Sequence, residues 1–249
     1  MTEPDGRWIR RFRPVQDARA TLVCFPFAGG SASYFFPLSR ALPAWVEVCA
    51  VQYPGRQDRR SECCIEDIVV LADRIAEALR GWPRRDMVLL GHSMGATVAF
   101  EVARRLEFSG SVGPSPTRLI ASARRAPTIP TETLVHRRTD SEIMSEMRRL
   151  QSSSTAAIID DELLSSFLPA IRADFKAIET YVCAADTEIG CPITAFAGEA
   201  DPVTSLDQVT AWAECTSGEF DLRVFPGGHF FLDGWSSANV AVIEEYLVV

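Results

Sequence analysis

The chain has 249 residues, 47% of them hydrophobic, and a formal net charge of −8. A chain of this length most simply forms one domain, residues 1–249, with a sizeable core. It has no apolar run near the ~20 residues that span a bilayer, and its charged N-terminal segment lacks the apolar stretch of a secretory signal. We therefore expect a cytoplasmic protein that does not enter a membrane.

Charge is unevenly distributed along the chain. Residues 1–150 hold 22 Lys and Arg against 17 Asp and Glu, a net of +5, whereas residues 151–249 hold 3 against 16, a net of −13. This balance argues against nucleic-acid binding. An acidic protein partner would meet the arginine-bearing first part, for instance at the pairs 124–125, 137–138 and 148–149, unless these pairs are simply solvated surface.

The seven cysteines show no metal-ligand spacing, and their number is odd. They stand at positions 24, 49, 63, 64, 183, 191 and 215. Several fall within apolar runs, which is typical of buried thiols in a reducing compartment. We expect free cysteines and no metal site.

Short β-rich runs alternate with helical patterns along most of the chain. In chain order, the expected strands are 21–27, 46–53, 87–91, 118–123, 193–197 and 222–225. The expected helices are 34–42, 65–82, 94–106, 205–215 and 239–247. The alternation predicts an α/β fold with a mostly parallel sheet and helices on both faces.

The alternation breaks at about 126–183. Two helical patterns, 140–151 and 160–182, replace the strands there, and Pro169 is expected to kink or split the second. The second pattern carries an apolar stripe made of Leu163, Leu164, Phe167, Leu168, Ile171, Phe175 and Ile178. A helical insertion at this place predicts a lid over the site; the alternative is a structural insertion whose stripe lies in the core.

The pentapeptide Gly-His-Ser-Met-Gly at 91–95 indicates a nucleophile. It follows the apolar run 87–90 and opens the helical pattern 94–106, so Ser93 falls at a sharp turn from strand to helix. This context matches the nucleophile elbow, in which two glycines let the backbone segments approach and expose the serine hydroxyl. The motif alone is weak, and an ordinary glycine-rich turn is the alternative.

A serine nucleophile needs a base, and the chain has three histidines. His92 flanks Ser93 and should point away from it, and His136 lies in the expected lid. His229 follows two glycines in the loop after the last expected strand, from which it can reach Ser93. We therefore predict His229 as the base, against the alternative of a structural loop histidine.

The carboxylate that orients the base should follow a strand between Ser93 and His229. Asp201, in the loop after the expected strand 193–197, is the candidate, with Glu199 as the backup. Asp221 and Asp233 are less favoured by position. The resulting order Ser, Asp, His is that of α/β-hydrolases.

Two backbone N–H groups usually stabilise the oxyanion in acyl transfer. One should belong to Met94, the residue after the nucleophile, and the other to the loop after the first strand, where Ala28 is the candidate and Phe27 the backup. The pair Gly29-Gly30 suits a backbone turned toward a ligand, although a plain strand-to-helix turn would also use it. No Gly-Lys-Ser/Thr follows, which excludes a phosphate loop.

The chain resembles the type II thioesterases, the stand-alone editing hydrolases of polyketide and nonribosomal peptide synthases. The resemblance extends over nearly the whole chain, through the Asp201 loop and the segment 227–230, and Pro-Gly-Arg at 54–56 and Arg-Ala-Asp-Phe at 172–175 are its most discriminating parts. The stretches that carry it are Cys-Phe-Pro-Phe-Ala-Gly-Gly-Ser at 24–31, Val-Gln-Tyr-Pro-Gly-Arg at 51–56, Gly-His-Ser-Met-Gly-Ala at 91–96 and Leu-Pro-Ala-Ile-Arg-Ala-Asp-Phe at 168–175.

The resemblance implies a serine-linked acyl intermediate and hydrolysis of acyl groups from the phosphopantetheine arm of an acyl- or peptidyl-carrier protein. It implies a helical lid over an acyl chamber, an acidic carrier as partner, and no metal or organic cofactor. Phe27 is a departure, because family members often have histidine there. The expected substrate-binding residues are Phe27, Gly29, Met144, Met147 and Phe167.

Three other functions stay open at this point. A carboxylesterase for free small molecules would use the same three residues, as would an acyltransferase that passes the acyl group to an amine or alcohol. A module that binds carrier proteins without catalysis would leave the acyl group in place. A monomer is the default oligomeric state.

Overall fold

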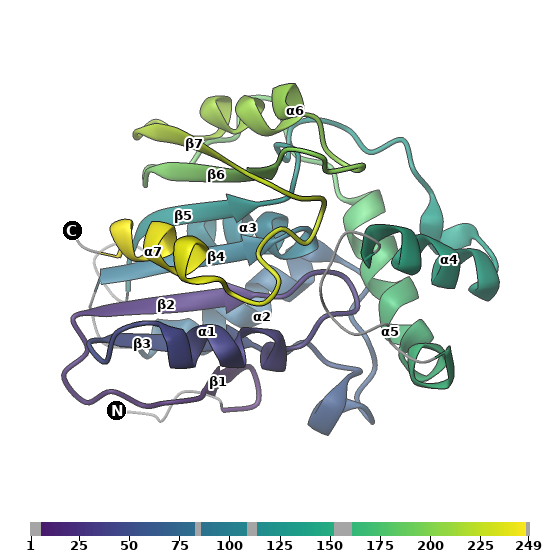
Figure 1. Ribbon diagram of the computed structural model, residues 1–249, viewed down its shortest axis with the longest axis horizontal. Coiled ribbons are helices and arrows are strands. Elements are labelled where there is room, and N and C mark those ends of the chain that lie inside the picture. The colour runs from purple at the N-terminus through teal and green to yellow at the C-terminus, as the bar shows by residue number, and fades with distance from the viewer. Residues whose placement is uncertain (1–5, 83–85, 109–113, 152–160, 248–249) are drawn as a thin grey trace.

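The protein is described by a computed structural model over residues 6–82, 86–108, 114–151 and 161–247, with the backbone alone at 151 and 161–164. Within these ranges seven strands form one sheet in the order β1-β3-β2-β4-β5-β6-β7 (Figure 1). The strands are β1 Ile9–Arg11, β2 Ala20–Phe25, β3 Val46–Val51, β4 Asp86–His92, β5 Pro116–Ser122, β6 Ile193–Gly198 and β7 Phe220–Phe225.

Six of these strands run parallel, and only the edge strand β1 pairs antiparallel, with β3. The six parallel strands are those that the sequence predicts, each within three residues of its expected ends. β1 was not predicted, because three residues with two arginines carry no strand pattern. The predicted α/β fold with a mostly parallel sheet is confirmed.

Helices cover both faces of the sheet, with α1 and α7 on one face and α2 and α3 on the other (Figure 1). Neighbouring residues of one strand therefore enter different cores: Leu22 of β2 lies under α1 and α7, and Val23 lies under α2 and α3. The helices are α1 Phe36–Ala41, α2 Ile68–Arg80, α3 Met94–Phe108, α4 Asp140–Gln151, α5 Asp161–Thr180, α6 Leu206–Thr210 and α7 Ser237–Glu245. Short 3-10 turns are η1 Ala32–Phe35, η2 Gln57–Arg59, η3 Val135–Arg137 and η4 Ala211–Cys215.

Side-chain caps explain where some helices begin. The sequence pattern predicts a helix from residue 65, but α2 begins at Ile68, because the carboxylate of Asp67 accepts a hydrogen bond from the N–H of Val70 at 3.0 Å. Likewise Ser205 and Gln208 form a reciprocal capping box at the start of α6. These caps define the first residues of the two helices.

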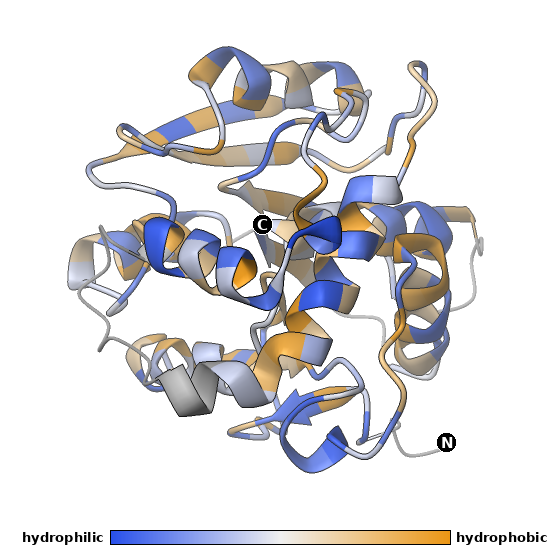
Figure 2. Cartoon of the chain, turned by 90° about the vertical axis from the view of Figure 1, so that its right-hand side faces the viewer, coloured by the Kyte–Doolittle hydropathy of each residue, from blue (hydrophilic) through white to orange (hydrophobic). Residues whose placement is uncertain are grey.

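The helices α4 and α5 stand beside the end of the sheet at which the parallel strands finish (Figure 1). They enclose a separate apolar cluster that includes Ile143, Met147, Leu168 and Ile171. Figure 2 views the molecule from this side and shows hydrophobic and hydrophilic residues mixed along the helices, as amphipathic helices require. α5 runs unbroken through Pro169, so the predicted split does not occur. The serines at 152–154, which the sequence places between the two helical patterns, lie outside the described residues.

No helix in the described ranges is both long enough and apolar enough to cross a membrane. All seven cysteines are free, and four of them are buried. Within the same part of the chain, no group of three or more His, Cys, Asp or Glu is arranged to hold a metal ion.

Candidate active site

Ser93 stands at a sharp turn between the end of β4 and the start of α3. Its φ angle is 54°, in the left-handed region that residues other than glycine rarely adopt. A Cβ atom on Gly91 would lie 2.2 Å from the carbonyl oxygen of Gly95, and one on Gly95 would lie 2.1 Å from that of Phe25. Neither glycine can therefore carry a side chain without moving backbone, and the turn has the geometry of a nucleophile elbow.

A continuous chain of hydrogen bonds joins Ser93, His229 and Asp201. The Nε2 atom of His229 lies 3.0 Å from the hydroxyl of Ser93. Its Nδ1 atom lies 2.9 Å and 3.1 Å from the two carboxylate oxygens of Asp201. The side chains of His229 and Asp201 are 2% and 0% exposed, so water scarcely competes for these bonds.

The surroundings of Asp201 decide which nitrogen of His229 carries the proton. Burial acts to raise the pKa of Asp201, but hydrogen bonds from His229, from the N–H of Val203 at 2.8 Å and from the hydroxyl of Thr204 at 2.9 Å hold it below the ordinary value. An ionised carboxylate only accepts hydrogen bonds, so Nδ1 of His229 donates. The lone pair of Nε2 then faces the Ser93 hydroxyl, as a base requires.

The other acidic candidates are either exposed or hydrogen-bonded to other residues. Glu199 is exposed at the surface. Asp221 accepts a hydrogen bond from the hydroxyl of Tyr246, and Asp233 accepts one from Tyr34 at 2.7 Å. Of the carboxylates weighed from the sequence, Asp201 alone meets His229.

The other two histidines have partners of their own. Nδ1 of His92 lies 3.0 Å from the hydroxyl of Ser122 on β5, and Nδ1 of His136 lies 2.6 Å from the carboxylate of Glu179 on α5. Burial, and secondarily His229, lowers the pKa of His92 to about 3, so this ring is neutral at pH 7. As expected, neither histidine is placed to serve as the base.

Two segments that can supply oxyanion donors lie beside Ser93. α3 begins at Met94, and an N–H in the first turn of a helix has no carbonyl partner within that helix. The close contact of Gly95 with the carbonyl of Phe25 brings this helix end against the loop that follows β2. Ala28 stands in that loop and is buried. Met94 and Ala28 stay the predicted donors.

A cavity of about 320 Å³ lies between the loop after β2 and helices α4 and α5. Four of the five expected substrate-binding residues line it: Phe27, Gly29, Met147 and Phe167. The fifth, Met144, packs with the apolar cluster between α4 and α5. Apolar walls of this kind suit an acyl chain; binding by these residues stays a prediction.

Phe27 belongs to a cluster of aromatic rings, of which Phe27 and Tyr34 line the cavity. Its ring meets those of Tyr34 and Phe230 edge-on, at centroid distances of 5.1 Å and 4.8 Å, and that of His92 at 6.1 Å. Edge-to-face contacts of this kind fix ring orientation. The departure noted in the sequence therefore places an apolar, rigidly held ring beside the predicted oxyanion loop.

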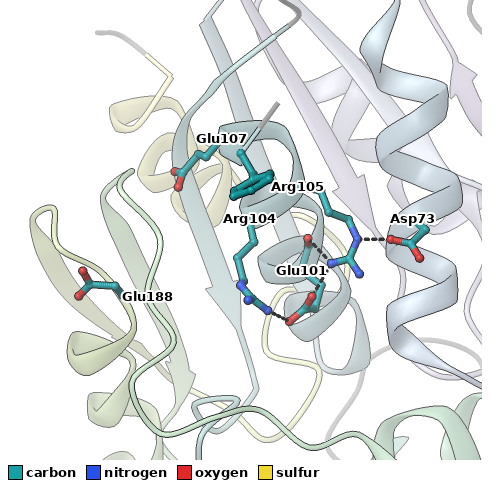
Figure 3. Close-up of a pocket in the computed structure, with 7 residues that line it drawn as sticks. Asp73, Glu101, Arg104, Arg105, Glu107 and Glu188 are labelled. Atoms are coloured by element: carbon teal, nitrogen blue, oxygen red, sulfur yellow. Dashed lines mark hydrogen bonds and ion pairs between the residues drawn. The ribbon is translucent and has the colours of Figure 1, made fainter. Parts of the chain in front are cut away.

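A second hollow, of about 640 Å³, is lined mainly by charged side chains (Figure 3). It is larger but lies at the far end of α3, a helix of 15 residues and therefore about 22 Å long. Its charges largely engage one another, since Glu101 pairs with Arg104 and Arg105, and Arg105 also pairs with Asp73. Among the described residues that line it, there is no serine, cysteine or histidine.

The arginine pairs considered as contacts for an acidic partner differ in exposure. Arg124 and Arg125 are not an exposed pair: Arg125 is only 9% exposed, and Arg124 is partly buried, which lowers its pKa to about 9. The carbonyl of Arg124 accepts a hydrogen bond from the indole of Trp212 at 2.8 Å, which ties this segment to the core. That expectation is therefore wrong for 124–125, whereas 137–138 and 148–149 are exposed.

The structure also joins two residues that the sequence did not pair. Arg56 and Asp174 form a buried ion pair, although 118 positions separate them. Each belongs to a stretch that carries the family resemblance. This shared membership is the one feature of the sequence that connects the two residues. Val203 and Thr204, which hold Asp201, were likewise not identified.

The fold and the Ser93–His229–Asp201 arrangement define the chain as an α/β-hydrolase. Residues 20–247 match the family model of the thioesterase domain. The chain belongs to this thioesterase family, and its resemblance to type II thioesterases is confirmed.

Three similar proteins document the relationship. Thioesterase PikA5 of Streptomyces venezuelae is 47% identical over 98% of this chain and 86% of its own length. A probable cadicidin biosynthesis thioesterase of Streptomyces griseus is 47% identical over 91% of this chain, which spans 62% of that protein's length. The solved structure of the type II thioesterase BorB, from the borrelidin biosynthetic cluster, is 42% identical with a TM-score of 0.90, covering 99% of this chain and 100% of that one.

Proposed function

We propose that this protein hydrolyses acyl thioesters on the phosphopantetheine arm of acyl- or peptidyl-carrier proteins. In this way it would remove stalled or aberrant acyl units during polyketide or nonribosomal peptide biosynthesis. The hydrogen-bonded chain from Ser93 through His229 to Asp201 carries the proposal. The likeness to PikA5 and BorB supports the thioester substrate and the pathway class.

The first half-reaction forms an acyl-enzyme. The Ser93 oxygen attacks the thioester carbonyl while Nε2 of His229 accepts the hydroxyl proton. Asp201 stabilises the resulting imidazolium, and the N–H groups of Met94 and Ala28 donate to the oxyanion. The tetrahedral intermediate collapses, the carbon–sulfur bond breaks, and the pantetheine thiol leaves with the proton from His229.

The second half-reaction releases the acid. A water molecule gives a proton to Nε2 of His229 and attacks the ester carbonyl, so a second oxyanion forms at the same donors. Collapse breaks the bond to the Ser93 oxygen, which takes back the proton from His229. The products are the free carboxylic acid and the original enzyme, and every step uses groups of this chain and water.

The helices beside the sheet end are proposed to serve as the lid, and their arginines as the contact for an acidic carrier. Arg138 and Arg149 are 43% and 47% exposed, and each has an ion-pair partner in Glu146. Exposed pairs of this kind are weak in water and can exchange one acidic partner for another. A cytoplasmic monomer stays the expectation for the free enzyme.

The direct test is release of free acid from a phosphopantetheinylated carrier protein loaded with an acetyl or propionyl group. An oxygen ester of the same acid is assayed in parallel. Ser93→Ala is the blank, and Ser217→Ala, at a serine in the loop before β7, is the matched control that should keep full activity. We expect Ser93-dependent release that is faster from the carrier than from the oxygen ester.

Each other outcome identifies a different function. Hydrolysis of the oxygen ester alone would identify a carboxylesterase and would remove the assigned roles of the lid and its arginines. Product that appears only with an added amine or alcohol would identify an acyltransferase. Binding of the loaded carrier without consumption would identify a non-catalytic module.

A further inference from the structure

Arg56 and Asp174 meet in a buried, two-pronged ion pair next to the loop that follows β2. Nη1 of Arg56 lies 2.6 Å from Oδ2 of Asp174, and Nη2 lies 2.8 Å from Oδ1. The two side chains are 2% and 1% exposed. This parallel geometry fixes the relative position and orientation of the two groups, beyond what a single contact would do.

The same pair holds the backbone of the loop at two consecutive residues. The N–H of Gly29 donates to Oδ2 of Asp174 at 2.7 Å, and Nη1 of Arg56 donates to the carbonyl of Gly30 at 3.1 Å. Gly29 has a φ angle of 78°, and a Cβ there would lie 2.6 Å from a side-chain carbon of Ile171, one turn before Asp174 on α5. The loop therefore has little freedom to move at the residue after Ala28.

Further contacts keep the arginine itself in place. Its Nε donates to the carbonyl of Pro54 at 3.2 Å, and its guanidinium lies 5.2 Å from the centre of the Tyr53 ring. Gln52 donates to the carbonyl of Arg56 at 3.3 Å and accepts a hydrogen bond from the N–H of Ala32 at 2.9 Å. The loop is thus anchored on both sides of its glycines.

A buried ion pair is a poor means of gaining stability, because removing two charges from water offsets most of their attraction. The pair does, however, fix the position of the backbone at Gly29 and Gly30. We propose that Arg56 and Asp174 are positioning residues that hold the N–H of Ala28 in line with the oxyanion at Ser93. The proposal rests on the proposed acyl-transfer chemistry and assigns the Pro-Gly-Arg and Arg-Ala-Asp-Phe stretches a common task.

The test uses conservative variants of both partners. Asp174→Asn keeps the shape and one oxygen but loses the charge, and Arg56→Lys keeps the charge but loses the two-pronged geometry. An oxyanion donor is worth about 100-fold or more in kcat, and displacing it by about 1 Å removes much of that. We expect kcat to fall about 30- to 100-fold in each variant, with KM changed by less than about threefold.

Glu179→Gln is the matched control. Glu179 lies on the same helix, is 3% exposed, and also accepts backbone hydrogen bonds, from Val135 at 2.8 Å and His136 at 3.0 Å. It holds η3 rather than the predicted oxyanion loop. A general loss of stability should lower its melting temperature as it does for Asp174→Asn, but its kcat should stay within about threefold of the wild type.

A second measurement separates positioning from a merely structural role. A trifluoromethyl ketone analogue of the substrate forms a tetrahedral adduct with Ser93, whereas a thioether analogue binds without reaction. Affinity for the ketone should fall by the same factor as kcat/KM in both variants, and affinity for the thioether should be unchanged. If Asp174→Asn does not fold, Arg56→Lys decides the matter alone.

Several results would overturn the proposal. These are a kcat within threefold of the wild type in a folded variant, equal losses for ketone and thioether, or an equal fall of kcat in Glu179→Gln. If the wild type ignores carrier thioesters, the proposed substrate is wrong, yet the ketone measurement still tests the role of Arg56 and Asp174 at Ser93.

Discussion

The burial of His92 beside the nucleophile predicts how the free energy of unfolding changes with pH. His92 is fully buried at the end of β4, and its pKa is lowered from 6.5 to about 3, first by burial and second by the neighbouring His229. Below pH 6.5 the unfolded chain binds a proton at this position that the folded protein does not bind. Lower pH therefore favours the unfolded state, and stability is lost as the pH falls from about 6.5 toward 3.

The size of this effect follows from the shift. Each pKa unit corresponds to about 1.4 kcal/mol, so a fall from 6.5 to about 3 corresponds to about 5 kcal/mol once both states are protonated. Between pH 7 and pH 5 the two proton-binding curves give a loss of about 2 kcal/mol from this one ring. That is a large fraction of the net stability of a typical domain.

The assay compares wild type with His92→Gln by urea unfolding at pH 7 and pH 5. Glutamine does not titrate in this range and can still bond to Ser122, while the other titrating groups are common to both proteins. We predict that the wild type loses about 2 kcal/mol more than the variant over this interval. Parallel losses in the two proteins would refute the assignment of a neutral, proton-resistant ring at His92.

Two further substitutions test the elbow and the base. Asp201→Asn places an amide donor against Nδ1 of His229 and favours the wrong tautomer, so kcat should fall about a thousandfold or more in a steady-state assay, while circular dichroism shows an unchanged fold. Gly95→Ala puts a Cβ 2.1 Å from the Phe25 carbonyl oxygen and should lower the free energy of unfolding by about 3 kcal/mol. In Gly190→Ala the nearest atom is 3.6 Å away, so this control should be neutral in the same denaturation experiment; equal effects would contradict the steric argument.

Local sequence is informative about this site because its principal residues each follow a strand directly. Ser93 stands at the end of β4, Asp201 lies three residues after β6, and His229 lies four residues after β7. The carboxyl ends of parallel strands meet at one edge of a sheet, so these loops come together once the strands are recognised. The chain has only three histidines, so few pairings of Ser93 with a base are possible.

Features that depend on packing between distant segments could not be predicted in this way. The partner of Arg56 is 118 residues away, and nothing local to either residue indicates a bond between them. The segment of Arg124 and Arg125 is tied to the core by a hydrogen bond from Trp212, 88 positions away, which nothing local to the arginines indicates. The continuation of α5 through Pro169 likewise reflects packing of its apolar face, which outweighs one lost backbone hydrogen bond.

In the proposed reaction, Ser93 takes the acyl group from a carrier-bound thioester. The most direct measurement mixes the enzyme with propionyl-loaded carrier protein, quenches the reaction in acid within milliseconds, and locates added mass by peptide mass spectrometry. We predict a propionyl group on the peptide that contains Ser93, formed before free acid accumulates and absent from Ser93→Ala. Release of acid from the carrier with no acyl group on Ser93 at any time would exclude an acyl-enzyme at Ser93.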